Sequence, residues 1–406
     1  MDTAFPRCAW WFGLLAALAA CRDAGSYPVD RLAVDTLANG TVVVSNPEHG
    51  VWDGASAWKV TEDLRIGSAD GEGADVFAAP SSLEVDAWGR IFVLDQQARE
   101  VRIFDARGRH VRSFGRRGAG PGELERPVAL SWGADGELWV VDPGNARFSV
   151  FDTTGAFRRM HIRFNGFMME PWPGIVDGFG RVYDVGMVEE RRERTPVLVR
   201  FARSFERADT FRLPSHRAVT FELQKGSRIH YSAPVPFTPA MVWALTPGGL
   251  VWSGSTDRYR LRLHRPEGDT LRVVERVYRP VEVESVEMDS IPRQMEWFTR
   301  QGGKIDLSRV PRTKPAFVSV RVDDRGYLWV RPSAPAADQK AAFDVFDPQG
   351  LYLGRVRLPA EIPDGLTLVI RGDLIYSVQL SDLGVPQVVR YRIHGRAGRG
   401  ELIPHL

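Results

Sequence analysis

A pattern that repeats after 47 residues constrains the fold of this chain more than any other feature. Residues 66–114 and 114–160 align with each other. Pro80 matches Pro127, and Phe92 matches Trp139. Internal repeats of about 20–50 residues are typical of proteins built from stacked copies of one small structural unit. The chain is therefore expected to be an array of such units.

Each unit contains two tight turns and four short strands. Polarity alternates between the turns, as in residues 90–95 and 137–142, which is typical of β-strands. The first turn ends in glycine, or Asp373 in the last copy, three residues before an aromatic; glycine accepts the positive φ angle that such turns need. The aromatic occurs six times, at Phe92, Trp139, Tyr183, Trp252, Trp329 and Tyr376. Four-stranded units at this period predict an all-β fold, a six-bladed β-propeller of antiparallel blades.

The spacing of the six motifs locates two insertions and an incomplete last blade. Gaps of 69 and 77 residues indicate insertions near 203–239 and 275–315. The last unit offers only three strands, near 366–370, 374–378 and 387–393. We expect residues 58–66 to supply its fourth strand, because this pairing removes two exposed sheet edges. A strand at 41–45 is expected to pack beside it, so the propeller would span residues 41–406.

Part of the repeat resembles a known family. Asp142-Pro-Gly-Asn145-Ala-Arg147 is similar to an NHL repeat, and so is the glycine-rich connector from Phe114 to Pro127. The resemblance covers residues 66–160, two of the six blades, and later blades keep only the turn pattern. It implies a six-bladed ring that often serves as a binding module, and it also implies that a few relatives are lyases or lactonases.

The N-terminus is predicted to be a targeting signal. Residues 9–20 form an apolar run of twelve, which is too short to span a bilayer and fits the core of a signal peptide. The run ends in Leu-Ala-Ala before Cys21, which resembles a bacterial lipobox and implies cleavage after residue 20 and acylation of Cys21. Residues 21–40 would then be a tether. An ordinary secretory signal is the alternative.

The lipobox predicts a membrane-anchored lipoprotein of the bacterial cell envelope. Arg22 is not the aspartate that signals inner-membrane retention in some bacteria, so the outer membrane is preferred. The charges of the chain add nothing to this attachment. Lysine and arginine total 53 against 51 aspartate and glutamate residues, and a net charge of +2 gives no reason to expect nucleic acid as a partner.

Motifs for metal, cofactor or nucleophilic chemistry are not recognisable in the sequence. The eight histidines share no short motif, and no Gly-x-Ser-x-Gly elbow occurs. We therefore expect no metal and no cofactor, and no catalytic residue is assigned. Among the acids of the innermost strands, only Glu84 is predicted to face the channel, because Asp86 and Asp177 match turn positions. Asp95 and Asp142 recur at strand ends and are interpreted as turn caps.

The long connections should all lie on one face of the ring, where ligands are expected to bind. Candidate binding residues on this face are Phe167, Met168, Trp172, Trp297, Arg116 and Arg117. The apolar loop 164–173 would either contact a partner or plug the ring. The two arginines belong to the segment 115–123, which is interpreted mainly as a connector between blades.

A short helix is predicted within residues 284–301. Ile291, Met295 and Phe298 occur at helical spacing, with a start near residues 289–290 and Pro292 in the first turn. This helix is expected to lie on the ring as a cap, or to bind a partner.

These features favour a non-catalytic binding or scaffolding propeller whose partner, a protein or a glycan, binds the long-loop face. The alternative is a hydrolase or lyase of the propeller kind, lactonase-like or amidating-lyase-like, that acts at the mouth of the channel. Carboxylates converging on one end of the channel would favour the enzyme.

Overall fold

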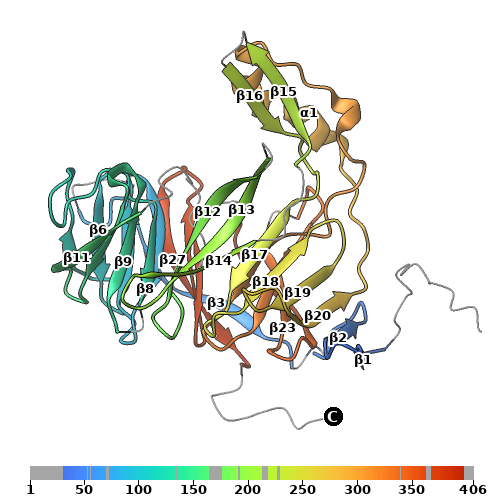
Figure 1. Cartoon of the computed structure of the whole chain (residues 1–406), viewed down its shortest axis with the longest axis horizontal. Coiled ribbons are helices and arrows are strands. Elements are labelled where there is room, and N and C mark those ends of the chain that lie inside the picture. Colours follow the sequence, from blue (N-terminus) through green and yellow to red (C-terminus); the bar gives the residue numbers. More distant parts are fainter. Residues whose placement is uncertain are drawn as a thin grey trace, which may run out of the picture.

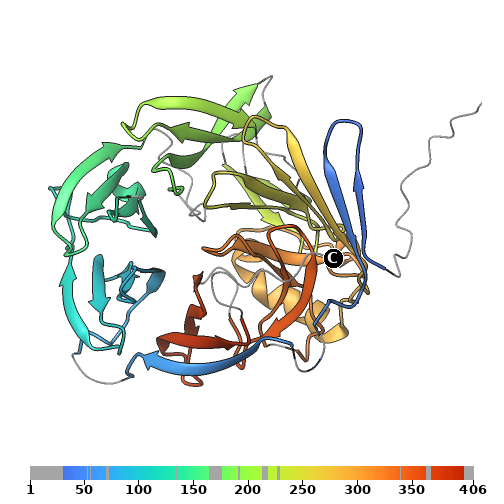
Figure 2. The ribbon, with the colours of Figure 1, turned by 90° about the horizontal axis from the view of Figure 1, so that it is seen from below.

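Six β-sheets stand side by side around a central axis in the computed structural model, which confirms the six-bladed propeller (Figures 1 and 2). The structure describes residues 31–52, 54, 56–69, 73–133, 135–163, 176–190, 193–212, 218–225, 229–338, 340–362 and 367–396. Each blade is an antiparallel sheet whose first strand is innermost. Most blades have four strands, as the repeat predicts.

Blades 1 and 2 are the two units that the repeat defines. Blade 1 consists of β4 (Pro80–Val85), β5 (Ile91–Asp95), β6 (Glu100–Phe104) and β7 (His110–Phe114). Blade 2 consists of β8 (Ala129–Trp132), β9 (Leu138–Asp142), β10 (Arg147–Phe151) and β11 (Phe157–Ile162). Of their four middle strands, β5, β9 and β10 are wholly buried and β6 is buried except at Glu100, because both faces of a blade pack against neighbours.

Blades 3 and 4 depart from the regular pattern. Blade 3 consists of β12 (Val182–Glu190), β13 (Glu193–Phe201) and β14 (Arg207–Arg212), and a bridge from Val176 to Val182 marks its inner edge. Blade 4 consists of β17 (Met241–Leu245), β18 (Val251–Ser255), β19 (Arg260–His264) and β20 (Thr270–Arg276). Two further strands extend its outer edge.

Blades 5 and 6 complete the ring. Blade 5 consists of β21 (Phe317–Val322), β22 (Leu328–Pro332), β23 (Ala342–Phe346) and β24 (Tyr352–Arg357). Blade 6 consists of β25 (Leu368–Arg371), β26 (Leu374–Leu380), β27 (Pro386–His394) and the N-terminal strand β3 (Lys59–Ile66). β3 pairs antiparallel with β27 from Ile66 opposite Val388 to Lys59 opposite His394, which confirms the predicted closure.

The other N-terminal strand does not lie where the sequence placed it. β2 (Val42–Asn46) was expected beside the closing strand, but it pairs in parallel with β20 of blade 4, and β1 (Ala33–Thr36) pairs with β2. β20 would otherwise present an open sheet edge, and pairing covers it. The Asn46 side chain holds β2 in this position: it donates hydrogen bonds to the carbonyls of Glu275 and Gly350 and accepts one from the Tyr352 amide.

The tight turns follow the predicted chemistry. The glycines that end the first turn of five blades have φ angles between 72° and 83°. An aspartate opens several turns and accepts hydrogen bonds from backbone amides inside them. Asp86 binds the amides of Trp88 and Arg90, and Asp323 binds those of Arg325 and Tyr327. Asp86 and Asp177 are thus turn residues, as the sequence indicated.

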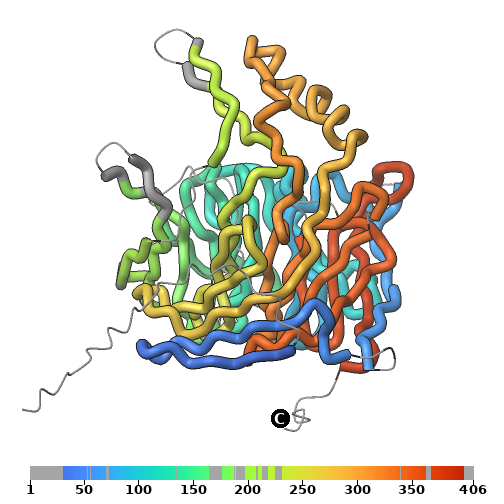
Figure 3. Tube along the Cα trace, turned by 90° about the vertical axis from the view of Figure 1, so that its right-hand side faces the viewer, coloured from blue at the N-terminus to red at the C-terminus, as the bar shows by residue number. Residues whose placement is uncertain are grey.

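The two insertions form a lobe that rises from the long-loop face of the ring (Figures 1 and 3). The lobe comprises the hairpin of β15 (Thr220–Lys225) and β16 (Ile229–Pro234), the helices α1 (Ser285–Gln294) and α2 (Glu296–Arg300), and the 3-10 helix η2 (Leu307–Arg309). Its own core contains Phe221, Ile291, Met295 and Phe298. Residues from insertions far apart in sequence therefore share one small core.

The predicted helix is present but differs in start and position. α1 begins at Ser285, four residues before the predicted start, because Glu287 accepts a hydrogen bond from the Glu284 amide and so caps the first turn. Pro292 lies inside the helix instead of in its first turn. The helix packs on the hairpin and stands off the ring, so the predicted cap lying on the ring is wrong.

Candidate functional site

The innermost strands of three blades carry charged side chains near the end of the channel where the tight turns lie. Asp86 opens the first turn of blade 1, and Glu84 lies two residues before it on β4. Arg321 has the same position in blade 5, two residues before Asp323. Arg371 lies at the end of β25, directly before the turn glycine of blade 6. We call Glu84, Arg321 and Arg371 the axial site. They belong to three consecutive blades, 1, 5 and 6 (Figure 2), and each is partly accessible to solvent.

Glu84 lies on the face of blade 1 that packs toward blade 2. Its neighbours in β4, Leu83 and Val85, contact the core between blades 1 and 6, so the alternation of a strand turns Glu84 the other way. It is paired across the sheet with Phe92, whose ring lies 4.9 Å from that of Trp132. The buried indole Nε1 of Trp132 has no hydrogen-bond partner among the described residues.

This surrounding protein changes the acidity of Glu84. Desolvation raises the pKa of the carboxyl from 4.5 to about 7, although Arg371 and the Val85 amide act in the opposite direction. No ion pair with Glu84 is found in the described part of the chain. A carboxyl with a pKa near neutrality exchanges its proton readily at physiological pH, which is what general acid–base catalysis requires.

Two arginines accompany Glu84 in the axial site. The Nη1 atom of Arg371 donates to the Val85 carbonyl at 2.6 Å, which holds the guanidinium against the strand that carries Glu84. Desolvation, followed by repulsion from Arg331, lowers the pKa of Arg321 to about 10, so Arg321 stays charged at neutral pH. Within the described ranges, no carboxylate lies within ion-pair distance of Arg321. The site thus offers a proton acceptor whose charge is influenced by Arg371, and a second cation, Arg321, two blades away around the ring.

The sequence identified one of these three residues. Glu84 was singled out as the acid of the channel; it lies on β4, the innermost strand of blade 1, and is partly exposed, so its predicted orientation into the channel stays a prediction. Arg321 and Arg371 were missed because only the acids of the innermost strands were considered; counting back two residues from Asp323 would have found Arg321. The axial site lies next to the tight turns, at the other end of the channel from the long-loop face, and the predicted role of the long-loop face stays a prediction.

The other predicted site residues do not come together in the part of the chain that the structure describes. Cys21, Phe167, Met168 and Trp172 lie outside the described residues. Trp297 lies in α2 of the lobe, with 51% of its surface exposed. Their predicted binding role, for a protein or a glycan, stays a prediction.

Arg116 and Arg117 lie in the connector between β7 and β8. Arg116 pairs with Glu123 at 2.9 Å, and Arg117 approaches Glu125 at 3.7 Å. Arg117 also forms a backbone bridge with Leu124, which closes the glycine-rich loop on itself. The segment is therefore a connector between blades, as interpreted. Both arginine side chains remain more than 70% exposed, so binding an anion there stays a prediction.

Asp95 and Asp142 act as caps of the connections that precede each blade. The Asp95 carboxylate accepts from the amides of Ala78, Ala79 and Ala98. Asp142 accepts from the amides of residues 125 and 126 and from the side chain of Asn145. Among the described residues, no group of three or more His, Cys, Asp and Glu side chains is placed to hold a metal ion.

The model of one protein family matches the chain over residues 77–159. This family, DUF5128, is described as a 6-bladed beta-propeller. The match covers blades 1 and 2, the two units that the sequence repeat defines. No curated protein matches the chain significantly.

Solved structures with a similar fold include several propeller enzymes. An inactive variant of virginiamycin B lyase from Staphylococcus aureus is 12% identical, covers 83% of this chain and 99% of its own, and has a TM-score of 0.43. A gluconolactonase from Xanthomonas campestris is 11% identical, covers 82% and 98%, and has a TM-score of 0.41. An aldose sugar dehydrogenase from Streptomyces coelicolor is 10% identical, covers 84% and 99%, and has a TM-score of 0.44.

These comparisons correct the expectation of a non-catalytic binding or scaffolding propeller. Three of the similar structures are named as a lyase, a gluconolactonase and a dehydrogenase, and none of these three is named as a binding or scaffolding protein. At such low identity the likeness extends to the fold alone. The choice of a reaction therefore depends on the chemistry of the axial site.

Proposed function

We propose that the protein is a lyase that acts on a small carboxylate substrate at the axial site. Glu84 would transfer the proton, and Arg371 and Arg321 would hold the carboxylate. The observation that carries this proposal is the place of Glu84, an accessible acid at the axis with no ion-pair partner among the described residues and with an arginine beside it.

The reaction is an elimination in which one group serves as base and then as acid. The Glu84 carboxylate takes a proton from the carbon next to the substrate carboxylate. The electron pair of that C–H bond forms a C=C bond, and the bond from the next carbon to the leaving group breaks. The Glu84 carboxylic acid then returns the proton to the leaving group. The guanidinium groups stabilise the negative charge that builds up on the substrate carboxylate in the transition state.

A substrate panel with Glu84→Gln tests this proposal. Purified protein would be given β-substituted carboxylates, and formation of the conjugated double bond would be followed by ultraviolet absorbance. Replacing the proton-transferring group should lower kcat about 10²–10⁴-fold. Arg371→Gln should mainly raise KM, because it removes a binding contact. Glu137→Gln, which changes a blade glutamate paired with Arg159, is the matched control and should leave turnover unchanged.

The pH profile adds an independent test. The base must be ionised to accept a proton, so kcat/KM should rise with pH and level off above about 7, the pKa of Glu84. Turnover that survives in Glu84→Gln would contradict the proposal. Turnover confined to lactones or esters would replace the lyase by the hydrolase alternative.

We also propose that the chain is an acylated envelope protein whose repeats descend from NHL-like units. The lipobox ending at Cys21 supports this, and two or three acyl chains anchor a protein stably where one does not. No helix among the described residues is long and apolar enough to cross a membrane. Cys21→Ser in a bacterial host should move the protein from the membrane to the soluble envelope fraction. A variant that still sediments with membranes would disprove the anchor.

A further inference from the structure

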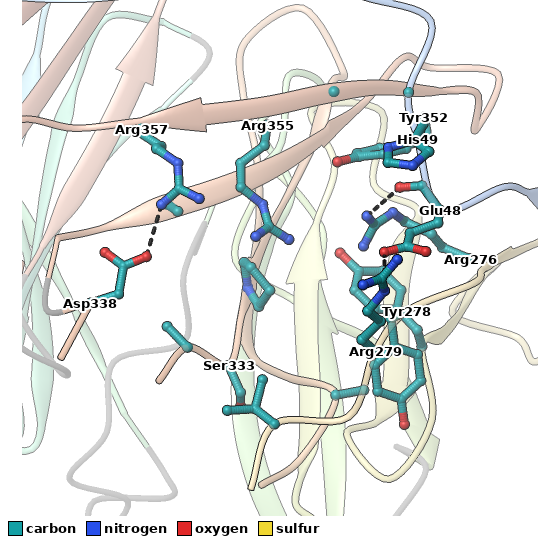
Figure 4. A pocket seen from close by; sticks show the side chains of 18 of the residues that line it. Glu48, His49, Arg276, Tyr278, Arg279, Ser333, Asp338, Tyr352, Arg355 and Arg357 are labelled. Carbon is teal, nitrogen blue, oxygen red and sulfur yellow. Dashed lines mark hydrogen bonds and ion pairs between the residues drawn. The ribbon is translucent and has the colours of Figure 1, made fainter. Parts of the chain in front are cut away.

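A second concave site lies on the flank of the ring, away from the axis. It is a pocket of about 690 Å³ between blades 4 and 5, closed on one side by the N-terminal residues 48–52, 54 and 57 (Figure 4). This volume suits a small organic ligand. Four arginines line the pocket, namely Arg276, Arg279, Arg355 and Arg357.

One fully buried carboxylate organises the floor of the pocket. Asp344 of β23 accepts hydrogen bonds from Arg276 at 3.1 Å and from Arg355 at 2.8 and 3.2 Å. The hydroxyls of Tyr259 and Tyr352 donate to the same carboxylate, at 2.7 and 3.1 Å. Two guanidinium groups on one carboxylate leave a net positive charge at the floor. A cation with little access to water attracts an anion strongly.

The two arginines at the floor, Arg276 and Arg355, differ in the N–H donors that remain available to a ligand. Arg276 is nearly buried, donates to the Glu48 carbonyl and lies over the ring of Tyr352. The Arg355 side chain is 34% exposed and projects into the middle of the pocket (Figure 4). Its Nη1 atom makes no hydrogen bond to any described residue, so this donor faces the space where a ligand would sit.

The rim carries two further arginines on opposite sides. Arg279 pairs with Glu48 at 2.7 Å, and Arg357 pairs with Asp338 at 2.9 Å (Figure 4). These pairs are exposed, so each contributes little energy and either arginine is free to turn toward an anion. Counting the four arginines against Glu48, Asp338 and Asp344 leaves one positive charge for the whole pocket.

Packing holds the N-terminal side of the pocket in place. Trp52 lies on Gly354 of β24 so closely that a Cβ atom there would come within 2.5 Å of the indole. The amides of Val51 and Trp52 donate to the carbonyls of Tyr352 and Leu353, which adds the segment to the edge of blade 5. Trp52 is therefore held in place, and its half-buried ring lines the pocket together with that of Tyr278.

From this arrangement we infer that the flank pocket binds a small organic anion, with a carboxylate or phosphate group on Arg355 and a flat body against Tyr278 or Trp52. Guanidinium groups bind both kinds of anion through paired N–H donors. The inference does not depend on the proposed activity of the axial site, because no residue is shared between the two.

Calorimetric titration with four probes tests the inference. Phenyl phosphate and benzoate carry both an anion and a ring, whereas inorganic phosphate and acetate lack the ring. We expect phenyl phosphate or benzoate to bind with a Kd of about 0.1–1 mM, and the ringless probe of the same charge to bind about tenfold more weakly. Whichever ring-bearing probe binds more tightly identifies the anion as phosphate or carboxylate.

Variants then assign the binding to this pocket. Arg355→Gln should weaken binding at least tenfold, and Arg357→Gln about threefold, since it removes only a rim charge. Tyr278→Leu should abolish the preference for the ring-bearing probe. Arg109→Gln, at an exposed turn arginine paired with Asp105, and Glu84→Gln at the axis should both leave affinity unchanged.

Arg355→Gln leaves Asp344 with one cation fewer, so its folding must be checked by thermal melting. If Arg355→Gln fails to fold, the exposed rim variant Arg357→Gln still tests the inference. The inference is overturned if the intact protein binds none of the four probes at about 10 mM, or if folded Arg355→Gln, Arg357→Gln and Tyr278→Leu all bind as the parent does.

Discussion

Blades 1 and 2 and the lobe are both built around buried aromatic residues, yet they reach this state by different routes. The blades bury Phe92, Leu94 and Val140 through contacts between adjacent units of one repeat. The lobe buries Phe221 and Phe298 by bringing together two insertions separated by the whole of blade 4. Every blade depends on its neighbours around a closed ring, whereas the lobe has a core of its own.

This difference indicates two levels of cooperativity. Loss of one interblade core opens the ring, because each blade covers the next, whereas loss of the lobe core should release only the insertions. The lobe is tied to the ring at its base, where Lys314 pairs with Glu287 at 2.6 Å and donates to the Ala334 carbonyl. Breaking either core in turn would test this comparison.

The largest effect is expected from removing the closing strand. Deletion of residues 31–66 takes β3 away from β27 and exposes a long edge that includes Val388 and Tyr391. The expected loss in free energy of unfolding equals or exceeds the whole net stability of a typical domain, about 5–15 kcal/mol. The deletion protein should therefore show no cooperative unfolding transition. Urea unfolding followed by circular dichroism measures this. A deletion protein that unfolds at the parent's midpoint would disprove the dependence on closure.

A smaller and local effect is expected in the lobe. Phe298 is fully buried, and Phe298→Ala should destabilise the lobe by about 3–5 kcal/mol. Hydrogen exchange should rise in the peptides covering β15, β16, α1 and α2 and stay unchanged in blades 1 and 2. The neighbouring Trp297→Ala removes an exposed side chain and should cost less than about 0.5 kcal/mol. Increased exchange in the blades would show that the lobe and ring unfold together.

The smallest effect on stability is expected at the axial site, which belongs to neither core, and it depends on pH. The pKa of Glu84 is raised from 4.5 to about 7, so the folded state binds the proton more tightly than the unfolded state, and stability falls as pH rises from about 4.5 to 7. Glu84→Gln removes that penalty. The variant should be more stable than the parent by about 2–3 kcal/mol at pH 8 and equal to it near pH 4. A constant difference across this range would show that the carboxyl is well solvated.

The ring was predictable from the sequence because each blade repeats a local signal. Glycine turns, alternating strands and the missing fourth strand of the last blade gave the blade count and the pairing of β3 with β27. The parallel pairing of β2 with β20 was not predictable, because an apolar strand fits any open edge equally well. The start of α1 was missed because Glu284 and Glu287 form the cap where the sequence pointed to residues 289–290.

The sites were predictable only in part. Glu84 was found because it is an acid on an innermost strand. The flank pocket was not found, because its residues come from β20, β23, β24 and the N-terminal segment and are not close in sequence. The shared core of the lobe was missed for the same reason. Contacts between distant segments leave no periodic trace in a single sequence.

The closure of blade 6 also sets a time order for synthesis. Thr61 of β3 contacts His394 of β27, a residue 333 positions later in the chain. At about 5–20 residues per second, β3 leaves the ribosome roughly 20–70 s before its partner exists. Until then no partner edge is available to β3, whose amides and carbonyls are open to other strands. Chaperones that bind extended segments therefore have their longest opportunity at β3, and a slower ribosome lengthens it.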